Sequence, residues 1–173
     1  MYIQCRVLED VTPEIVAAFD RWENDSDLIP FVRPNRTEAD LKRREPVTRE
    51  MLAARLKNHC IFLVYEGERL IGEVNYQVDP PQLYRKAPGS AWIGITIGEA
   101  DVRGMGAGTF AMRFLETEVR TRGLKRIELG VFEFNNSAIN LYRKLDYNEI
   151  ARIPNFTFYQ GRLWQDIRME KHL

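Results

Sequence analysis

Gly98-Glu-Ala-Asp-Val-Arg-Gly-Met-Gly-Ala-Gly108 is the stretch of sequence that decides the fold. Before it stands Ala91-Trp-Ile-Gly-Ile-Thr-Ile97, whose β-branched residues favour a strand. After it, residues 109–120 carry apolar side chains at helical spacing, with charged side chains turned elsewhere. The glycines of the quoted stretch therefore lie in a loop that leaves a strand and opens a helix.

A loop of this kind suits a phosphate group. Gly104, Gly106 and Gly108 have no side chains, so a ligand can approach the backbone closely. The first amides of the following helix lack internal partners and lie at the positive end of its dipole. No Gly-Lys-Ser/Thr run follows, which excludes a P-loop, and the glycine spacing does not fit the dinucleotide fingerprint. A tight strand-to-helix connection without a ligand is the alternative.

Arg103-Gly-Met-Gly-Ala-Gly108 resembles the Arg/Gln-x-x-Gly-x-Gly/Ala loop of the Gcn5-related N-acetyltransferase (GNAT) superfamily. A second part of the resemblance lies downstream, where residues 135–147 are similar to the family pattern Asn-x-x-Ala-x-x-x-Tyr-x-x-x-Gly-Phe. The matching residues are Asn135, Ala138, Tyr142 and Tyr147. Asp146 stands where the family usually has glycine. Because Asp tolerates the left-handed conformation better than most residues, we still expect a helix C-terminal turn there.

The composition is that of a single globular domain, which we expect to span residues 1–173. The 25 basic residues balance the 25 acidic ones, which gives no indication of a nucleic-acid partner. No apolar run reaches membrane-spanning length and no secretory leader is evident, so we expect a cytoplasmic protein. Two cysteines are too few for a disulfide framework, and no spacing of ligands resembles a metal site.

The remaining elements indicate a mixed α/β sheet of the α+β kind, mostly antiparallel and twisted, with helices at its sides. This order agrees with a single GNAT-type domain over nearly the whole chain. In chain order we expect a strand at 3–8, a helix opened by Thr12, a turn-rich acidic segment at 21–30, a helix at 48–57, a hairpin of 60–65 with 70–78, the strand at 91–97, the helix after the glycine loop, a strand at 129–131, a helix from 135, and a closing antiparallel pair at 149–153 and 163–169.

The resemblance implies transfer of an acetyl group from acetyl-CoA to a primary amine by direct attack in a ternary complex. The loop would hold the cofactor pyrophosphate, and a backbone amide between Ile95 and Ile97 would stabilise the thioester oxygen. Asn135 would contact the cofactor arm or cap the following helix. The implied loop contacts are Arg103, Gly104, Met105, Gly106, Ala107, Gly108 and Thr109.

Two side chains are implied to move protons. Tyr142 occupies the family position of the acid that protonates the leaving thiolate, although many helical tyrosines only pack or hydrogen-bond. Glu73 is the candidate for the base that deprotonates the amine, because the strand before the loop carries no carboxylate. An outward-facing strand glutamate or an ion pair is the alternative for Glu73. Glu99, at the mouth of the loop, is expected to be solvated.

The acceptor is less well defined by the sequence. In the family, the early helical region covers the acceptor site, so Asp25 and Asp27 would attract a cationic amine; a solvated surface loop is the alternative. We therefore expect a cationic small molecule such as a polyamine, an aminoglycoside or an amino-acid derivative. A protein N-terminus is the second acceptor class, and a non-catalytic acyl-CoA sensor is a different function on the same fold. GNAT proteins are often dimers, so a homodimer is possible.

Overall fold

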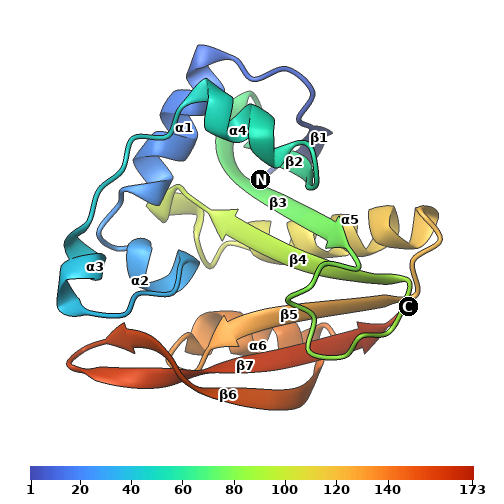
Figure 1. Cartoon of the computed structure of the whole chain (residues 1–173). Coiled ribbons are helices and arrows are strands. Elements are labelled where there is room, and N and C mark those ends of the chain that lie inside the picture. The colour runs from blue at the N-terminus through green and yellow to red at the C-terminus, as the bar shows by residue number, and fades with distance from the viewer.

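The protein, described over all 173 residues by a computed structural model, is built on one seven-stranded sheet with strand order β1-β2-β3-β4-β5-β7-β6 (Figure 1). The strands are β1 (Ile3–Val7), β2 (Cys60–Glu66), β3 (Arg69–Val78), β4 (Ser90–Ile97), β5 (Arg126–Phe132), β6 (Asn148–Tyr159) and β7 (Arg162–His172). The helices are α1 (Pro13–Glu23), α2 (Ile29–Val32), α3 (Glu38–Lys42), α4 (Arg49–Arg55), α5 (Ala107–Thr121) and α6 (Asn136–Lys144).

The sheet is antiparallel at every contact except that between β4 and β5. These two strands run parallel and pair only from Ser90 to Trp92 on β4, opposite Arg126 to Glu128 on β5. Beyond Trp92 they separate, and Figure 1 shows them diverging toward the left of the view. The predicted mixed, mostly antiparallel sheet is confirmed, and its one parallel contact opens into a gap.

Each face of the sheet has its own hydrophobic core. The larger core packs α5 and α6 against one face, with β4 contributing Ile93, Ile95 and Ile97. The smaller core packs α1 and α4 against β2 on the opposite face. Because side chains alternate along a strand, the second face receives Trp92, Gly94 and Thr96 of β4. The helices of the smaller core cover the β2 side of this face, and the loop between β3 and β4 reaches over β5.

Local sequence signals explain most helix ends. The Thr12 and Thr48 hydroxyls each accept a hydrogen bond from an amide three residues later, as good N-caps do. Asp146 has a φ of 66°, so the predicted left-handed turn after α6 is confirmed. The expectation of a turn-rich segment at 21–30 was too simple, because α1 continues to Glu23 and the short helix α2 follows.

Candidate active site

The glycine loop presents a row of unpaired backbone amides. Gly106 is the N-cap of α5 with a φ of 96°, and no side chain caps this helix. A Cβ built on Gly104 or Gly106 would meet no atom within 4 Å, so the loop faces open space. Five amides donate no hydrogen bond within the chain: those of Gly104, Gly106, Ala107, Gly108 and Thr109. Together with the positive end of the α5 dipole, they form a site for a phosphate group.

Arg103 organises this loop from within. Its Nε donates to the carbonyl oxygen of Ile97 at 2.9 Å, and its Nη2 donates to that of Gly98 at 2.6 Å. These two bonds tie the start of the loop to the end of β4. The cofactor contact of the Arg103 side chain remains a prediction, and the structure adds a positioning role that the sequence did not indicate.

The gap beside β4 exposes a free strand edge. Gly98 donates its amide to Ile71 of the neighbouring β3, and such bonds alternate along an antiparallel strand. The amides of Ile95 and Ile97 therefore face away from β3, toward β5. Since β5 pairs with no residue of β4 beyond Trp92, this edge is open to an extended ligand. The predicted residues Ile95 and Ile97 thus lie at the gap.

Tyr142 lies on α6, the helix that packs against the start of α5. A Cβ on Gly108, at the start of α5, would be only 3.4 Å from the Leu141 side chain, so α6 packs directly against that end of α5. Tyr142 is 6% exposed, and burial raises the pKa of its phenol to about 12. Its hydroxyl forms no hydrogen bond within the chain and is not completely buried. The phenol therefore keeps its proton at neutral pH, and its role as the acid stays a prediction.

Asn135 precedes the helix that carries Tyr142 and acts as its N-cap. Its Oδ1 accepts a hydrogen bond from the Ala138 amide at 3.3 Å. This is one of the two roles expected for Asn135, and it fixes the start of α6. The other role, contact with the cofactor arm, remains a prediction.

Glu73 lies on β3, the strand next to β4. It is 7% exposed and pairs with Thr96 of β4, so both side chains share the face that α1 and α4 pack against. The Asn75 amide nitrogen lies 3.0 and 3.2 Å from its two oxygens, and Arg55 Nη2 lies 3.7 Å from Oε1. Burial raises the pKa of Glu73, although Arg55 and Asn75 oppose the shift. Glu73 is thus a desolvated carboxylate with one loose ionic partner.

Glu99 is not solvated, contrary to expectation. It accepts hydrogen bonds from Arg21 at 2.5 Å and from the Trp22 indole at 2.9 Å, and Arg69 lies 3.3 Å away. These donors lower its pKa although burial opposes them. No local sequence pattern indicates this contact, because the partners of Glu99 on α1 are 77 and 78 residues away. Glu99 therefore joins α1 to the mouth of the glycine loop.

Asp25 and Asp27 lie in the turn between α1 and α2. The Asp25 side chain accepts a hydrogen bond from the Asp27 amide at 2.8 Å, while Asp27 is exposed. Trp22 packs onto the backbone of Gly98 at the end of β4, where an added Cβ would be 2.2 Å from the indole. The turn with Asp25 and Asp27 therefore comes shortly after Trp22, the residue of α1 that contacts the end of β4. Acceptor binding by these two carboxylates stays a prediction.

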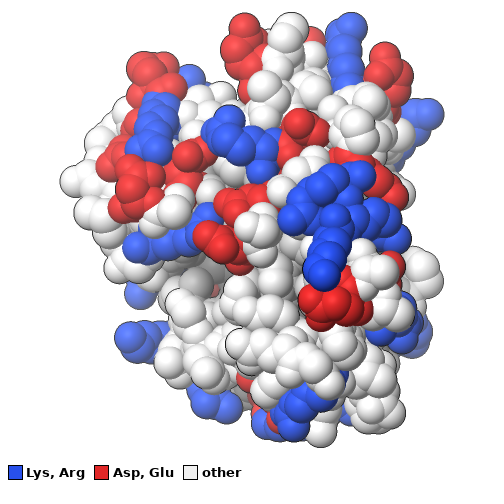
Figure 2. All heavy atoms as spheres, turned by 90° about the vertical axis from the view of Figure 1, so that its left-hand side faces the viewer, with Lys and Arg blue, Asp and Glu red and all other residues white.

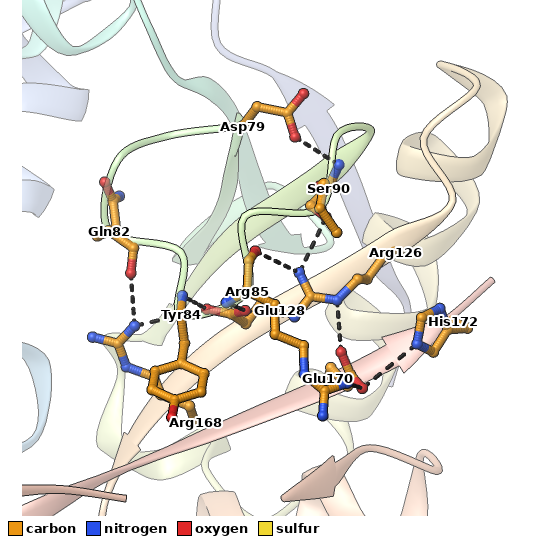
Figure 3. A network of polar contacts seen from close by, with 11 residues as sticks. Asp79, Gln82, Tyr84, Arg85, Ser90, Arg126, Glu128, Arg168, Glu170 and His172 are labelled. Atoms are coloured by element: carbon orange, nitrogen blue, oxygen red, sulfur yellow. Dashed lines mark hydrogen bonds and ion pairs between the residues drawn. The ribbon is translucent and has the colours of Figure 1, made fainter. Parts of the chain in front are cut away.

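A buried charge network, which the sequence reasoning missed, covers β5 and β7 on the same face as Glu73 (Figure 3). Arg126 donates to Glu170 at 2.6 Å and to Glu128 at 2.5 Å, and Arg168 donates to Asp166 at 2.7 Å. The loop between β3 and β4 closes over the network, with the Tyr84 amide donating to Glu128. Alternation of charged residues along β7 is the signal that would have revealed it.

Four aromatic side chains meet where α2 approaches the end of the β6–β7 hairpin. This aromatic cluster consists of Phe31, Phe134, Tyr159 and Trp164. Its ring centroids lie 4.6–6.0 Å apart, which is normal for packed aromatic pairs. Figure 2 views this end of the molecule, where charged side chains crowd the upper half and the lower half is largely uncharged. The cluster therefore joins α2 to the β6–β7 hairpin.

A surface pocket of about 640 Å³ lies elsewhere, on α1 and the segment before α4. It is lined by Asp10, Asp20 and Arg49 among other residues, and none of the predicted site residues takes part. Asp20 is already engaged there by the Val47 amide. No group of three His, Cys, Asp or Glu side chains is arranged to hold a metal ion, and no helix is long and apolar enough to cross a membrane.

The family model described as the acetyltransferase (GNAT) family matches residues 18–147. This range includes the glycine loop, the open edge of β4 and Tyr142. The chain belongs to the GNAT family. GNAT membership makes it an acetyl-CoA-dependent acetyltransferase. No curated protein sequence matches the chain at a significant level.

Solved structures agree with the GNAT fold over the whole chain. A ribosomal-protein-alanine N-acetyltransferase from Brucella melitensis is 20% identical, with a TM-score of 0.75 over 98% of this chain and 99% of that one. A putative acetyltransferase (yncA) from Salmonella typhimurium, solved with its cofactor acetyl-CoA, is 18% identical, with a TM-score of 0.75 over 99% and 94%. A putative phosphinothricin N-acetyltransferase is 16% identical, with a TM-score of 0.76 over 99% of both chains.

The residues of this GNAT chain fit acetyl-CoA. Five free amides at the start of α5 match a pyrophosphate, and the open edge of β4 matches the amides of an extended pantetheine arm. The loop and the strand edge thus fit the pyrophosphate and the pantetheine arm, while the individual contacts, that of Tyr142 included, stay predictions.

Proposed function

We propose that the chain transfers the acetyl group of acetyl-CoA to a primary amine of a cationic small molecule, by direct attack in a ternary complex. The observation that carries the proposal is the open edge of β4 beyond Trp92. Glu73 of β3 pairs with Thr96 of β4, and Tyr142 belongs to the helix packed at the start of α5. We therefore assign the role of base to Glu73 and the role of acid to Tyr142.

When bound, acetyl-CoA supplies an activated acetyl thioester. A backbone amide between Ile95 and Ile97, at the strand edge that faces the gap, donates a hydrogen bond to the oxygen of the group being transferred. One such preorganised donor contributes about 3 kcal/mol to lowering a barrier. Glu73 accepts a proton from the attacking amine, either directly or through a water molecule. Its raised pKa makes it a stronger base than an ordinary glutamate. Tyr142 donates its phenolic proton to the departing thiolate.

The acceptor class rests on three carboxylates, those of Glu73, Asp25 and Asp27. Glu73, Asp25 and Asp27 would all favour a positively charged amine over a neutral or anionic molecule. A protein N-terminus is the second class, and the ribosomal-protein-alanine N-acetyltransferase among the similar structures supports testing it. A non-catalytic acyl-CoA sensor is the third. The cytoplasmic location and the homodimer also remain predictions.

Free thiol release from acetyl-CoA tests the proposal, measured across polyamines, aminoglycosides, amino acids and short peptides. Release that depends on a cationic small amine supports it, whereas release with peptides alone would assign the chain to protein N-termini. If no amine promotes release above background hydrolysis, the melting temperature is measured with and without acetyl-CoA. A rise without turnover identifies a sensor, and no rise contradicts the cofactor site itself.

A further inference from the structure

Asp166 lies at the end of the buried charge network nearest the gap. It is 3% exposed and belongs to β7, but its carboxylate leans over β5. A Cβ added to Gly130 would lie 2.8 Å from Asp166 Oδ2 and 3.1 Å from the Trp92 ring. Trp92 is the last β4 residue that pairs with β5, opposite Glu128, and Gly130 comes two residues later. The carboxylate of Asp166 is therefore located where β4 and β5 begin to separate.

The three carboxylates of the network differ in how fully they are bonded. Both oxygens of Glu128 accept hydrogen bonds, from Arg126 and from two loop amides. Both oxygens of Glu170 also accept, from Arg126 and Arg85. Asp166 accepts a single bond, from Arg168 to Oδ2, and its Oδ1 accepts none. Of these three carboxylates, only Asp166 has an oxygen that accepts no hydrogen bond.

This free oxygen is not sealed inside the protein. The only completely buried side-chain polar atoms without a hydrogen-bond partner are Glu116 Oε1 and Tyr147 Oη. Since Asp166 Oδ1 also has no partner, it retains a contact with solvent. It shares the sheet face on which Glu73 lies, because Trp92 pairs with both Gln77 of β3 and Glu128 of β5. An unbonded carboxylate oxygen on a desolvated surface attracts a hydrogen-bond donor, and a cationic one most strongly.

We propose that Asp166 Oδ1 binds a second cationic group of the acceptor, so that the chain selects diamines and related polyamines over monoamines. This inference rests on the proposed acetyl transfer. The attacking amine lies over the edge of β4, beside Glu73, while the Asp166 carboxylate lies over β5. Neighbouring strands are about 4.8 Å apart, and these two diverge. The second charge is therefore about 5 Å or more from the amine, which four methylene groups can span.

The first test compares two acceptors on the unaltered protein. 1,4-Diaminobutane carries the second charge and n-butylamine lacks it, with the same carbon chain. We expect kcat/KM for thiol release to be at least about 10-fold higher for the diamine, the size of one charged hydrogen bond. An equal or higher value for n-butylamine, or release with uncharged peptides alone, overturns the inference and leaves acetyl transfer intact. Failure of every amine refutes the proposed function first.

The second test replaces Asp166 by Asn. We expect Asp166→Asn to lower kcat/KM for 1,4-diaminobutane about 10- to 100-fold, mainly through KM, while n-butylamine changes less than about threefold. A folding defect would affect both amines equally and so contradict a specific role. The matched control is Glu149→Gln on β6, which also removes a carboxylate bonded to an arginine, Arg152. We expect Glu149→Gln to leave the ratio of kcat/KM for 1,4-diaminobutane to kcat/KM for n-butylamine unchanged. A change in this ratio as large as that in Asp166→Asn overturns the inference.

Discussion

Gly106→Arg tests the pyrophosphate site, with Gly123→Arg as its matched control. The two glycines flank α5, Gly106 before its start and Gly123 after its end, and both have positive φ angles, 96° and 79°. A Cβ built on either meets no atom within 4 Å. The two variants thus add the same side chain and a similar backbone strain, and they differ only in what the new side chain faces.

The strain predicts a similar loss of stability in both variants. A residue other than glycine in the left-handed region costs roughly 1–2 kcal/mol. For a chain of this length, that loss lowers Tm by about 2–8 °C. We expect both variants to keep a native far-UV circular dichroism spectrum, since no packed atom has to move.

Acetyl-CoA binding separates the two variants. A hydrogen bond to a charged group contributes about 1.5–3 kcal/mol. If the side chain in Gly106→Arg displaces the pyrophosphate from two of the five free amides, binding loses at least about 3 kcal/mol, which is more than about 100-fold in Kd. Isothermal titration calorimetry of acetyl-CoA measures this change. The reasoning is refuted if Gly106→Arg binds within about threefold of the unaltered protein, or if Gly123→Arg is weakened as much.

Three further substitutions test the remaining parts of the site. Tyr142→Phe should lower kcat roughly ten- to a thousand-fold with unchanged acetyl-CoA affinity. The control, Tyr147→Phe, removes a buried hydroxyl without a partner and should keep normal turnover. Equal turnover in the two variants would remove the acid role of Tyr142. Burial raises the pKa of Glu73, so kcat/KM should rise with pH, with a midpoint above the usual pKa range of glutamate. Glu73→Gln should abolish this rise in the pH–rate profile. A profile in which the rise persists would point to another base. Gly98→Ala places a Cβ 2.2 Å from the Trp22 indole and should lower the free energy of unfolding, measured in urea, by about 1–3 kcal/mol. A typical substitution lowers it by roughly 1 kcal/mol. A free energy of unfolding within about 0.5 kcal/mol of that of the unaltered protein would mean that the contact with Trp22 is easily relieved.

The parts of the site that were predictable are those encoded by neighbouring residues. The glycine loop combines a strand, three glycines and a helix within about 30 residues, so its role in opening α5 follows from the sequence alone. Tyr142 and the turn at Asp146 follow from one motif. In each case the physical constraint is local: a backbone conformation, a cap or a helical face.

The parts that were not predictable depend on pairing between distant residues. Asp166 acquires its position from Gly130, whose missing side chain leaves room for a carboxylate on another strand. Glu99 was expected to be solvated because its donors on α1 are far away in the chain. Helices as short as α2, with four residues, give no reliable periodicity. Strand register decides which side chains share a face, and no single segment of sequence contains it.

Glu99 and Trp22 connect the two halves of the site mechanically. Trp22 belongs to α1, next to the turn that carries the acidic residues proposed to meet the acceptor, and its indole bonds the residue that precedes the cofactor loop. A ligand that shifted one end would have to break this contact or move the other end with it, and in the second case the two ligands would be thermodynamically coupled. Such coupling is reciprocal: whatever factor acetyl-CoA adds to amine affinity, the amine returns to acetyl-CoA. Binding order in this chain would then be a matter of kinetics, while the strength of the ternary complex is set jointly by both ligands.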